Sequence, residues 1–205
     1  RVEHEFYVSD SVLSDTPRFI GRYLNLIRVG REETEELWSA GAGQGDRENW
    51  MVNACDTLEA GQPCGHRAKC HEAFGMVNID DLGEVGLYPY NSEALERAVL
   101  RAETRVPEPL TPRRVLDDCV STILSEADVH IGKFDYPHER TRHQFDFEVH
   151  TDQDVLLAQN PSADPERTYR ALVIWGDEEP LSTGILEAFS LEVTSEKRDG
   201  DRGRA

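Results

Sequence analysis

The feature that most constrains this chain is a run of cysteines and histidines between residues 55 and 71. Three of its four cysteines, Cys55, Cys64 and Cys70, fall within sixteen positions, with eight and then five residues between them. Glycine and proline residues on both sides of Cys64 favour tight turns of the backbone. Because Zn²⁺ takes four sulfur or nitrogen ligands in a tetrahedron, this clustering predicts one structural zinc site.

A histidine completes the predicted ligand set, and two histidines stand in this segment. His71 follows Cys70 directly and is the predicted fourth ligand, while His66 is the alternative. A disulfide and unliganded thiols are the other interpretations, although three clustered cysteines would leave one unpaired. Cys119, the remaining cysteine, lies in an apolar helical pattern and is expected to belong to the core.

The spacing of the three cysteines matches that of RNA-binding Cys-x8-Cys-x5-Cys-x3-His fingers, but Phe74 occupies the histidine position. Apart from Arg67 and Lys69 the segment is neutral or acidic, and the whole chain carries a net charge of −18. Such a chain repels the phosphate backbone that dominates nucleic-acid affinity. Nucleic-acid binding is therefore disfavoured, and a stand-alone zinc-binding nucleic-acid recognition module is kept as the alternative function.

The composition of the 205 residues fits a folded chain with a core of its own. No apolar run approaches the length of a membrane span, and no secretory signal opens the sequence, so we expect a cytoplasmic protein without membrane contact. The chain starts with arginine and not methionine, and we expect it to be a fragment of a longer polypeptide. Acidic residues are spread along the whole chain, as in proteins with uniformly acidic surfaces.

The hydrophobic pattern predicts a mainly α-helical fold with a zinc knuckle and a few short strands. Capping residues mark several helix starts, notably Ser14–Pro17, Asn91 or Ser92, and Thr111 followed by Pro112. Residues 76–85 are expected to form a polar link, and short strands are expected within 1–13 and 144–149. Helices are predicted at these positions: from 14 to Gly30, 32–40, 68–74, from 92, from 112, 165–175 and 181–191.

No catalytic residue is predicted, because the sequence contains no Gly-x-Ser-x-Gly, His-Glu-x-x-His or Walker A motif. A zinc hydrolase would need an open coordination position, whereas three cysteines and one histidine predict a closed structural site. Four histidines between residues 130 and 150 could form a second metal site, but their spacings match no known ligand motif. They are His130, His138, His143 and His150.

Beyond the cysteines, a series of short motifs in a fixed order resembles one family. The series is similar to the region that follows the nucleotide-binding core in AAA+/STAND-type P-loop ATPases of prokaryotic antiphage defence, of the phage-exclusion or phosphorothioation-linked kind. The likeness covers roughly residues 15–190, with Tyr90 and Thr111 where the family has Phe and Asn. The motifs are Cys-His-x-Ala-Phe-Gly (70–75), Gly-Leu-Tyr-Pro-Tyr-Asn (86–91), Leu-x-Arg-Ala (95–98) and Thr-Pro-Arg-Arg-Val-Leu (111–116).

This resemblance implies that Arg113 is a nucleotide-binding lid arginine, which would reach the γ-phosphate of ATP. It implies a zinc-containing, lid-like helical domain over residues 1–130 and a smaller C-terminal helical lobe with an acidic tail over 131–205. The Walker A and B motifs are missing, so ATP would be bound and hydrolysed only by the longer parent protein. The expected function is a non-catalytic zinc-stapled domain that completes a nucleotide pocket or docks partner proteins of a defence complex.

Overall fold

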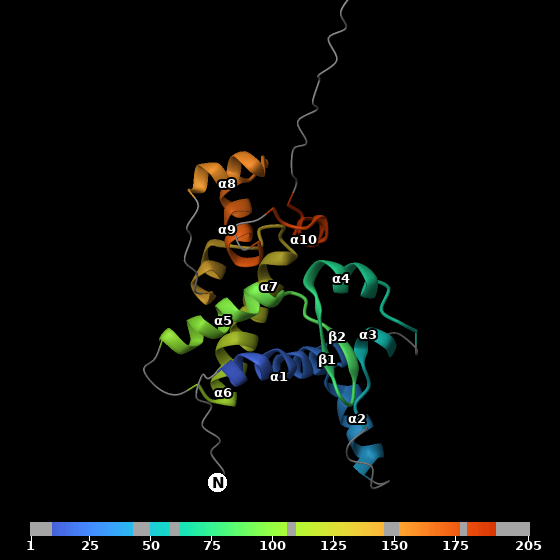
Figure 1. Ribbon diagram of the computed structural model, residues 1–205. Coiled ribbons are helices and arrows are strands. Elements are labelled where there is room, and N and C mark those ends of the chain that lie inside the picture. The colour runs from blue at the N-terminus through green and yellow to red at the C-terminus, as the bar shows by residue number, and fades with distance from the viewer. Residues whose placement is uncertain are drawn as a thin grey trace, which may run out of the picture.

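A computed structural model describes residues 10–42, 50–57, 62–105, 110–145, 152–176 and 180–191. The fold is mainly α-helical, as predicted, with one two-stranded sheet among the described residues (Figure 1). The predicted strands within residues 1–9 and 146–149, and the charged tail from residue 194, lie outside the described residues. The elements are α1 (Asp10–Val29), α2 (Arg31–Ala42), α3 (Ala54–Thr57), α4 (Arg67–Phe74), β1 (Met76–Ile79), β2 (Gly83–Gly86), α5 (Ser92–Arg105), α6 (Pro112–Arg114), η1 (Val115–Ser121), α7 (Thr122–Ile131), η2 (Glu139–Gln144), α8 (Gln153–Gln159), α9 (Pro165–Trp175) and α10 (Thr183–Ala188).

The first two helices differ in detail from the prediction. Helix α1 begins at Asp10, so Pro17 lies inside it and not in its first turn. It ends at Gly30, as expected, where the Gly30 N–H donates to the Leu26 carbonyl at 3.0 Å. Helical spacing of the apolar residues places Ile27 and Trp38 on the buried faces of these helices, but they are 56% and 47% exposed. The helical spacing identified the apolar face of α1 correctly, but the buried part of that face is narrower than predicted.

The predicted polar link at 76–85 is wrong, because these residues form an antiparallel hairpin. Strand β1 pairs with β2 in a register that sets Met76 opposite Gly86 and Ile79 opposite Gly83. Ile79 and Val85 point to a small apolar cluster with Leu82, and Met51 and Val77 pack at its edge. The hairpin lies against α1 and leads from α4 towards α5 (Figure 1).

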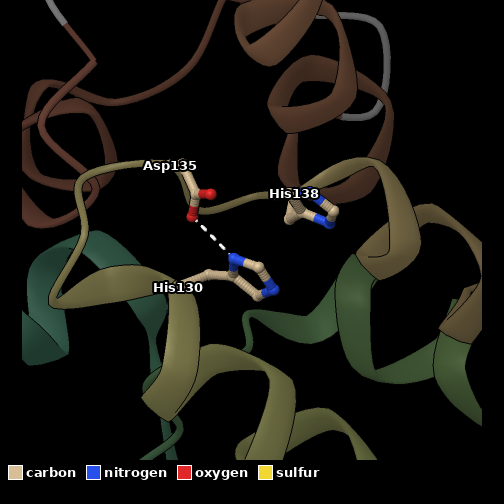
Figure 2. A group of neighbouring side chains, drawn as sticks. All are labelled: His130, Asp135 and His138. Atoms are coloured by element: carbon tan, nitrogen blue, oxygen red, sulfur yellow. Dashed lines mark hydrogen bonds and ion pairs between the residues drawn. The ribbon is translucent and has the colours of Figure 1, made fainter.

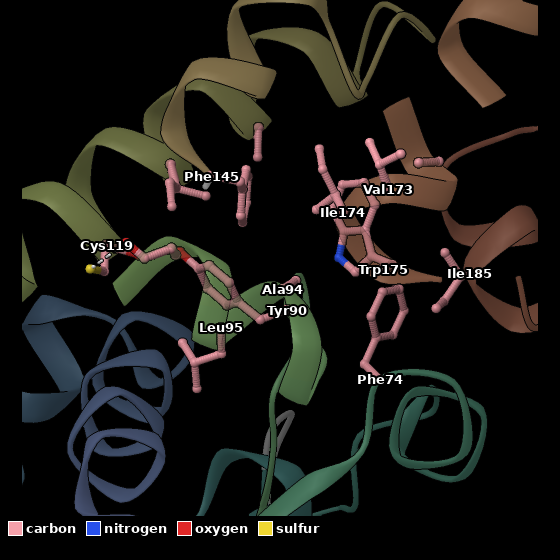
Figure 3. Packing of buried hydrophobic residues seen from close by; sticks show 14 of the residues in the cluster. Phe74, Tyr90, Ala94, Leu95, Cys119, Phe145, Val173, Ile174, Trp175 and Ile185 are labelled. Carbon is pink, nitrogen blue, oxygen red and sulfur yellow. Dashed lines mark hydrogen bonds between the residues drawn. The ribbon is translucent and has the colours of Figure 1, made fainter. Parts of the chain in front are cut away.

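One large hydrophobic core joins α1, α4, α5, η1, α7, α9 and α10 (Figure 3). Tyr90 and Trp175 are buried in it, and their polar atoms are satisfied by backbone carbonyls. The Tyr90 hydroxyl donates to the Cys119 carbonyl at 2.5 Å, and the Trp175 indole donates to the Pro89 carbonyl at 2.9 Å. The residues on both sides of position 130 contribute to this core, and the division into two lobes there stays a prediction.

Predicted caps fix two of the helices around this core. The Asn91 side chain accepts the Ala94 N–H at 2.9 Å, so Asn91 caps α5. The Thr111 hydroxyl accepts the Arg114 N–H at 3.3 Å, with Pro112 at the first helical position. The segment that follows is a π-helix, η1, before the chain resumes α-helical geometry in α7.

Helix α10 packs closely on α4 and so connects the C-terminal part of the chain to the cysteine-rich segment. A Cβ placed on Gly184 would lie 2.5 Å from the Cβ of Ala73, so glycine allows the two helices to approach. Phe74 and Phe189 meet edge to face nearby, with ring centroids 5.7 Å apart. This contact positions α4, which carries two of the predicted zinc ligands.

Candidate metal centre

The predicted zinc ligands come from three successive pieces of the chain that fold back on one another. Cys55 lies in the short helix α3, Cys64 lies in the turn before α4, and Cys70 and His71 lie on α4 itself. The Cys64 N–H donates to the Cys55 carbonyl at 3.0 Å, which ties the two segments together. The Cys64 carbonyl in turn accepts the Arg67 N–H at 3.0 Å, which turns the chain into α4.

Gly86 in strand β2 is the point on which these side chains converge. Its N–H lies 3.5 Å from the Cys55 Sγ, in hydrogen-bonding geometry. A Cβ at Gly86 would lie 3.1 Å from Nε2 of His71 and 3.3 Å from the Cys70 Sγ. The hairpin therefore brings two sulfurs and one imidazole nitrogen against the same backbone position.

His71 fits the role of the fourth ligand better than the alternative, His66. Nε2 of His71 is buried without a hydrogen-bond partner. The lone pair of a buried imidazole nitrogen is normally satisfied by a hydrogen-bond donor or by a metal ion. His66 is exposed. Burial, followed by the positive charge of Arg67, lowers the pKa of His71, which keeps its ring in the neutral form that binds metals.

The Cys70 thiol is affected by burial, by a nearby arginine and by the neighbouring cysteines. Burial raises the pKa of Cys70, opposed by the charge of Arg28 and by a backbone hydrogen bond at Tyr88. The nearby Cys55 and Cys64 add further to this rise, because neighbouring thiolates repel. A divalent cation would remove that repulsion, since it binds thiolates directly.

The four ligand atoms lie further apart than the corners of a zinc tetrahedron. Among the described residues, the group whose ligand atoms all lie within 4.8 Å of one another is a different one, His130, Asp135 and His138. A cavity of about 620 Å³ adjoins the cysteines. The cysteines, His71 and His66 all line this cavity.

All four cysteines are free thiols, so the disulfide alternative is not realised in this structure. Cys119 belongs to the hydrophobic core, as predicted, and is fully buried. Burial raises the pKa of its thiol to about 12. Cys119 is therefore a core residue and takes no part in the cluster.

Two of the basic residues near the cluster, Arg67 and Lys69, are paired with acidic ones. Arg67 forms ion pairs with Asp56 at 3.0 Å and with Glu84 at 3.3 Å. Lys69 lies 3.4 Å from Glu187. Arg28, which also lines the cavity, donates to backbone carbonyls. The pairing of Arg67 and Lys69 lowers the net positive charge that this surface offers for phosphate recognition.

Arg113, the predicted lid arginine, projects from α6 with 91% of its side chain exposed. It lies 3.6 Å from Asp117 one turn further along the chain. The structure does not bring Arg113 into the cysteine cluster.

A second group of side chains surrounds the end of α7 and includes two of the four histidines of the possible second metal site, His130 and His138 (Figure 2). Nδ1 of His130 lies 2.7 Å from the Asp135 carboxylate, and the rings of His130 and His138 stack with centroids 4.1 Å apart. His143 is exposed and lies apart from this group, and His150 falls outside the described residues. Asp135 reaches His130 only because the chain turns back at Phe134, where φ is 58°.

Comparisons with known proteins give no further guide to the function. No protein-family model matches the chain, and neither a curated protein nor a solved structure matches it. Within the described residues, none of the helices combines the length and the hydropathy that crossing a bilayer requires.

Proposed function

We propose that this chain is a non-catalytic, zinc-stapled helical domain that holds protein partners within a larger assembly. The observation that carries the proposal is the convergence of Cys55, Cys70 and His71 around Gly86, beside a cavity that Cys64 also lines, with a buried and unpartnered imidazole nitrogen. Three thiolates and one imidazole are the donor set of closed structural zinc sites. Bound there, zinc would supply a cross-link between α3, the turn at Cys64 and α4.

The parent assembly proposed here is a cytoplasmic AAA+/STAND-type ATPase of antiphage defence. Support comes from the motif order of the sequence and from the four free thiols, a state that reducing compartments maintain. Arg113 would then act on ATP bound by another segment, and its high exposure leaves it available for such a contact. A protein partner is favoured over nucleic acid by the net charge of −18 and by the paired cations beside the cysteines.

Metal analysis of the purified chain tests the structural part of the proposal. We expect one tightly bound zinc per chain at this site, lost in the Cys64→Ser/Cys70→Ser variant and retained in the Cys119→Ser control. Substoichiometric zinc in the wild type, with thiols that react freely without a chelator, would remove the proposal.

The ATPase part is tested separately, in the longer polypeptide that the resemblance predicts. There Arg113→Ala should lower ATP turnover roughly tenfold or more, because a guanidinium stabilises charge on the transferred phosphate. Arg31→Ala is the control, since Arg31 is similarly exposed and pairs with Glu35 in the same i, i+4 manner. Equal turnover in both variants would separate Arg113 from nucleotide chemistry while leaving the zinc site standing.

A further inference from the structure

The end of α7 carries a second group of potential metal ligands, far from the cysteines in sequence and different in chemistry. Glu126 and His130 are four residues apart on α7 and therefore share one face of the helix. Asp135 follows in the loop, and His138 stands at the start of η2. Only 13% of the His130 side chain is exposed, so the group is partly withdrawn from water.

The two nitrogens of His130 face two carboxylates. Nδ1 lies 2.7 Å from the Asp135 Oδ1, a short hydrogen bond in which Nδ1–H is the donor. Nε2 lies 3.4 Å from the Glu126 Oε2, which is too long for a charge-assisted hydrogen bond. The Glu126 oxygen is buried and has no hydrogen-bond partner. In the neutral tautomer that Asp135 selects, two acceptors therefore face each other across this gap.

A metal ion bound by both atoms removes the repulsion between the two acceptors, and the 3.4 Å distance between Nε2 and Oε2 fits such an ion. An ion bound tetrahedrally at about 2.0–2.1 Å from nitrogen and about 2.0–2.2 Å from oxygen separates the two ligand atoms by about 3.4 Å. A carboxylate on the far nitrogen of a ligating histidine is the usual outer partner of such sites, because it fixes the tautomer and the ring orientation. We propose that Glu126 and His130 bind a divalent transition-metal ion of the Zn²⁺ class, with Asp135 as the positioning residue.

His138 has a supporting role in this arrangement. Its ring lies nearly parallel to that of His130, at an interplanar angle of 8°. Its Nδ1 accepts the Arg140 N–H at 3.2 Å, so its neutral form carries the proton on Nε2. Because the lone pairs of stacked rings lie in parallel planes, His138 covers the His130 ring and does not ligate the same ion in this geometry. Water fills the remaining coordination positions, which makes the site open and weaker than the cysteine site.

The test is a Co²⁺ and Zn²⁺ titration of the full chain after removal of metal with a chelator. Thiolate-bound Co²⁺ gives intense near-ultraviolet charge-transfer absorption, whereas an imidazole and carboxylate site gives only weak visible bands. We expect a first equivalent with the thiolate signature and a second without it. Isothermal calorimetry then gives the Zn²⁺ affinity of the second equivalent in each variant.

Three substitutions assign that second equivalent. Glu126→Gln keeps the shape of the side chain and should weaken binding at least tenfold, and Asp135→Asn should weaken it about 10–100-fold. Asp128→Asn, an exposed carboxylate on the same helix, should leave the affinity within about twofold. If Glu126→Gln loses helical content, His130→Gln replaces it.

Three outcomes would overturn the inference. The first is a wild-type chain that takes up no second equivalent, and the second is a Glu126→Gln variant that binds it as tightly as wild type. The third is a ¹⁵N spectrum in which His130 is protonated on both nitrogens and unchanged by Zn²⁺, which would place a proton, and not a metal ion, between Nε2 of His130 and the Glu126 carboxylate. Loss of the thiolate signature alone would contradict the proposed zinc staple and leave this site unaffected.

Discussion

The cysteine-rich region and the helical core are held together by different means. We call residues 50–57 and 62–88 the cysteine unit. Its own apolar cluster has three buried members, Ile79, Leu82 and Val85. Among the described residues, the core around α5, α7 and α9 contains 27 buried members, to which the cysteine unit contributes Phe74. Burial of apolar area is the main source of stability, so the cysteine unit has little of it to draw on.

Hydrogen bonds from buried side-chain amides stabilise the cysteine unit, which buries little apolar area of its own. The Asn53 side chain donates to the carbonyls of Leu82 and Glu84, both at 2.9 Å, and accepts the Cys55 N–H at 2.9 Å. Asn25 of α1 donates to the Val52 carbonyl and accepts the Ala54 N–H, both at 2.8 Å. Directional bonds of this kind fix geometry without a large core, and each is costly to leave unmade.

Charged groups attach the same unit to α1. Arg28 donates to the carbonyls of Gly86 and Tyr88, both at 2.8 Å. Arg22 forms a paired contact with the Asp81 carboxylate, and this hydrogen bonding lowers the pKa of Asp81. A region that relies on a few polar contacts is one in which a structural metal would matter most.

The largest effect is expected in the helical core. Leu172→Ala removes a fully buried side chain and should lower the free energy of unfolding by about 2–5 kcal/mol. For a chain of this size that corresponds to a loss of roughly 10 °C in Tm by calorimetry. Leu100→Ala, at a site 37% exposed on α5, is the control and should cost less than about 1 kcal/mol. Similar losses at both positions would show that α9 is not central to the core.

Metal removal should have a local effect of comparable size. With zinc at 1,000 times its dissociation constant, mass action stabilises the bound state by about 4 kcal/mol. After chelation, hydrogen exchange should accelerate in peptides from residues 50–57 and 62–88 and stay slow in α9. Cys119→Ala, which leaves the ligands intact, should show the same response to the chelator. Uniform acceleration along the chain would erase the distinction between the two regions.

Asn53→Ala tests the buried amides. The change removes three hydrogen bonds and leaves two backbone carbonyls of the hairpin without this donor, at a cost of about 2–3 kcal/mol. Denaturant unfolding measures the loss. Asn78→Ala, at an exposed position on β1 of the same hairpin, is the matched control and should change stability by at most about 0.5 kcal/mol. Equal costs would mean that the hairpin depends on its strand pairing and not on Asn53.

How far the sequence predicted these features depends on how local their causes are. The caps Asn91 and Thr111, the helices they start and the burial of Cys119 all follow from neighbouring residues, and they were predicted correctly. The hairpin was missed because each strand has only four residues and its register depends on packing against α1. Zinc at the cysteines stays a prediction, although the structure brings its ligands around Gly86.

The four histidines between residues 130 and 150 drew attention to a possible second metal site, but their spacing did not show which side chains meet. The structure brings His130 and His138 together with Asp135, which was not among the candidates. Asp135 approaches His130 through the turn at Phe134, and a bulky residue with positive φ carries no sequence signal. The pair Glu126 and His130, one helical turn apart, was a local signal that could have been used.

The smallest expected effect is a difference in alkylation rate between the cysteines, which needs no change in stability. Because the thiolate is the reacting form, a thiol with its pKa near 12 is almost fully protonated and inert at pH 8. After chelation, alkylation at pH 8 followed by mass mapping should label Cys64 and Cys70, which are partly exposed, well before Cys119. Rapid labelling of Cys119 in the folded chain would contradict its place in the core.

The same raised pKa sets the sign of a pH effect. Above pH 9 the unfolded chain loses the Cys119 proton while the folded chain keeps it, so ionisation favours the unfolded state. This contribution to stability is complete below pH 9 and is lost as the pH rises towards 12. The fall in Tm between pH 8 and pH 10.5 should therefore be shallower in Cys119→Ala than in wild type, even though the variant starts lower. A parallel fall in both proteins would show that other groups control alkaline unfolding, and that the core does not hold this thiol as tightly as its burial implies.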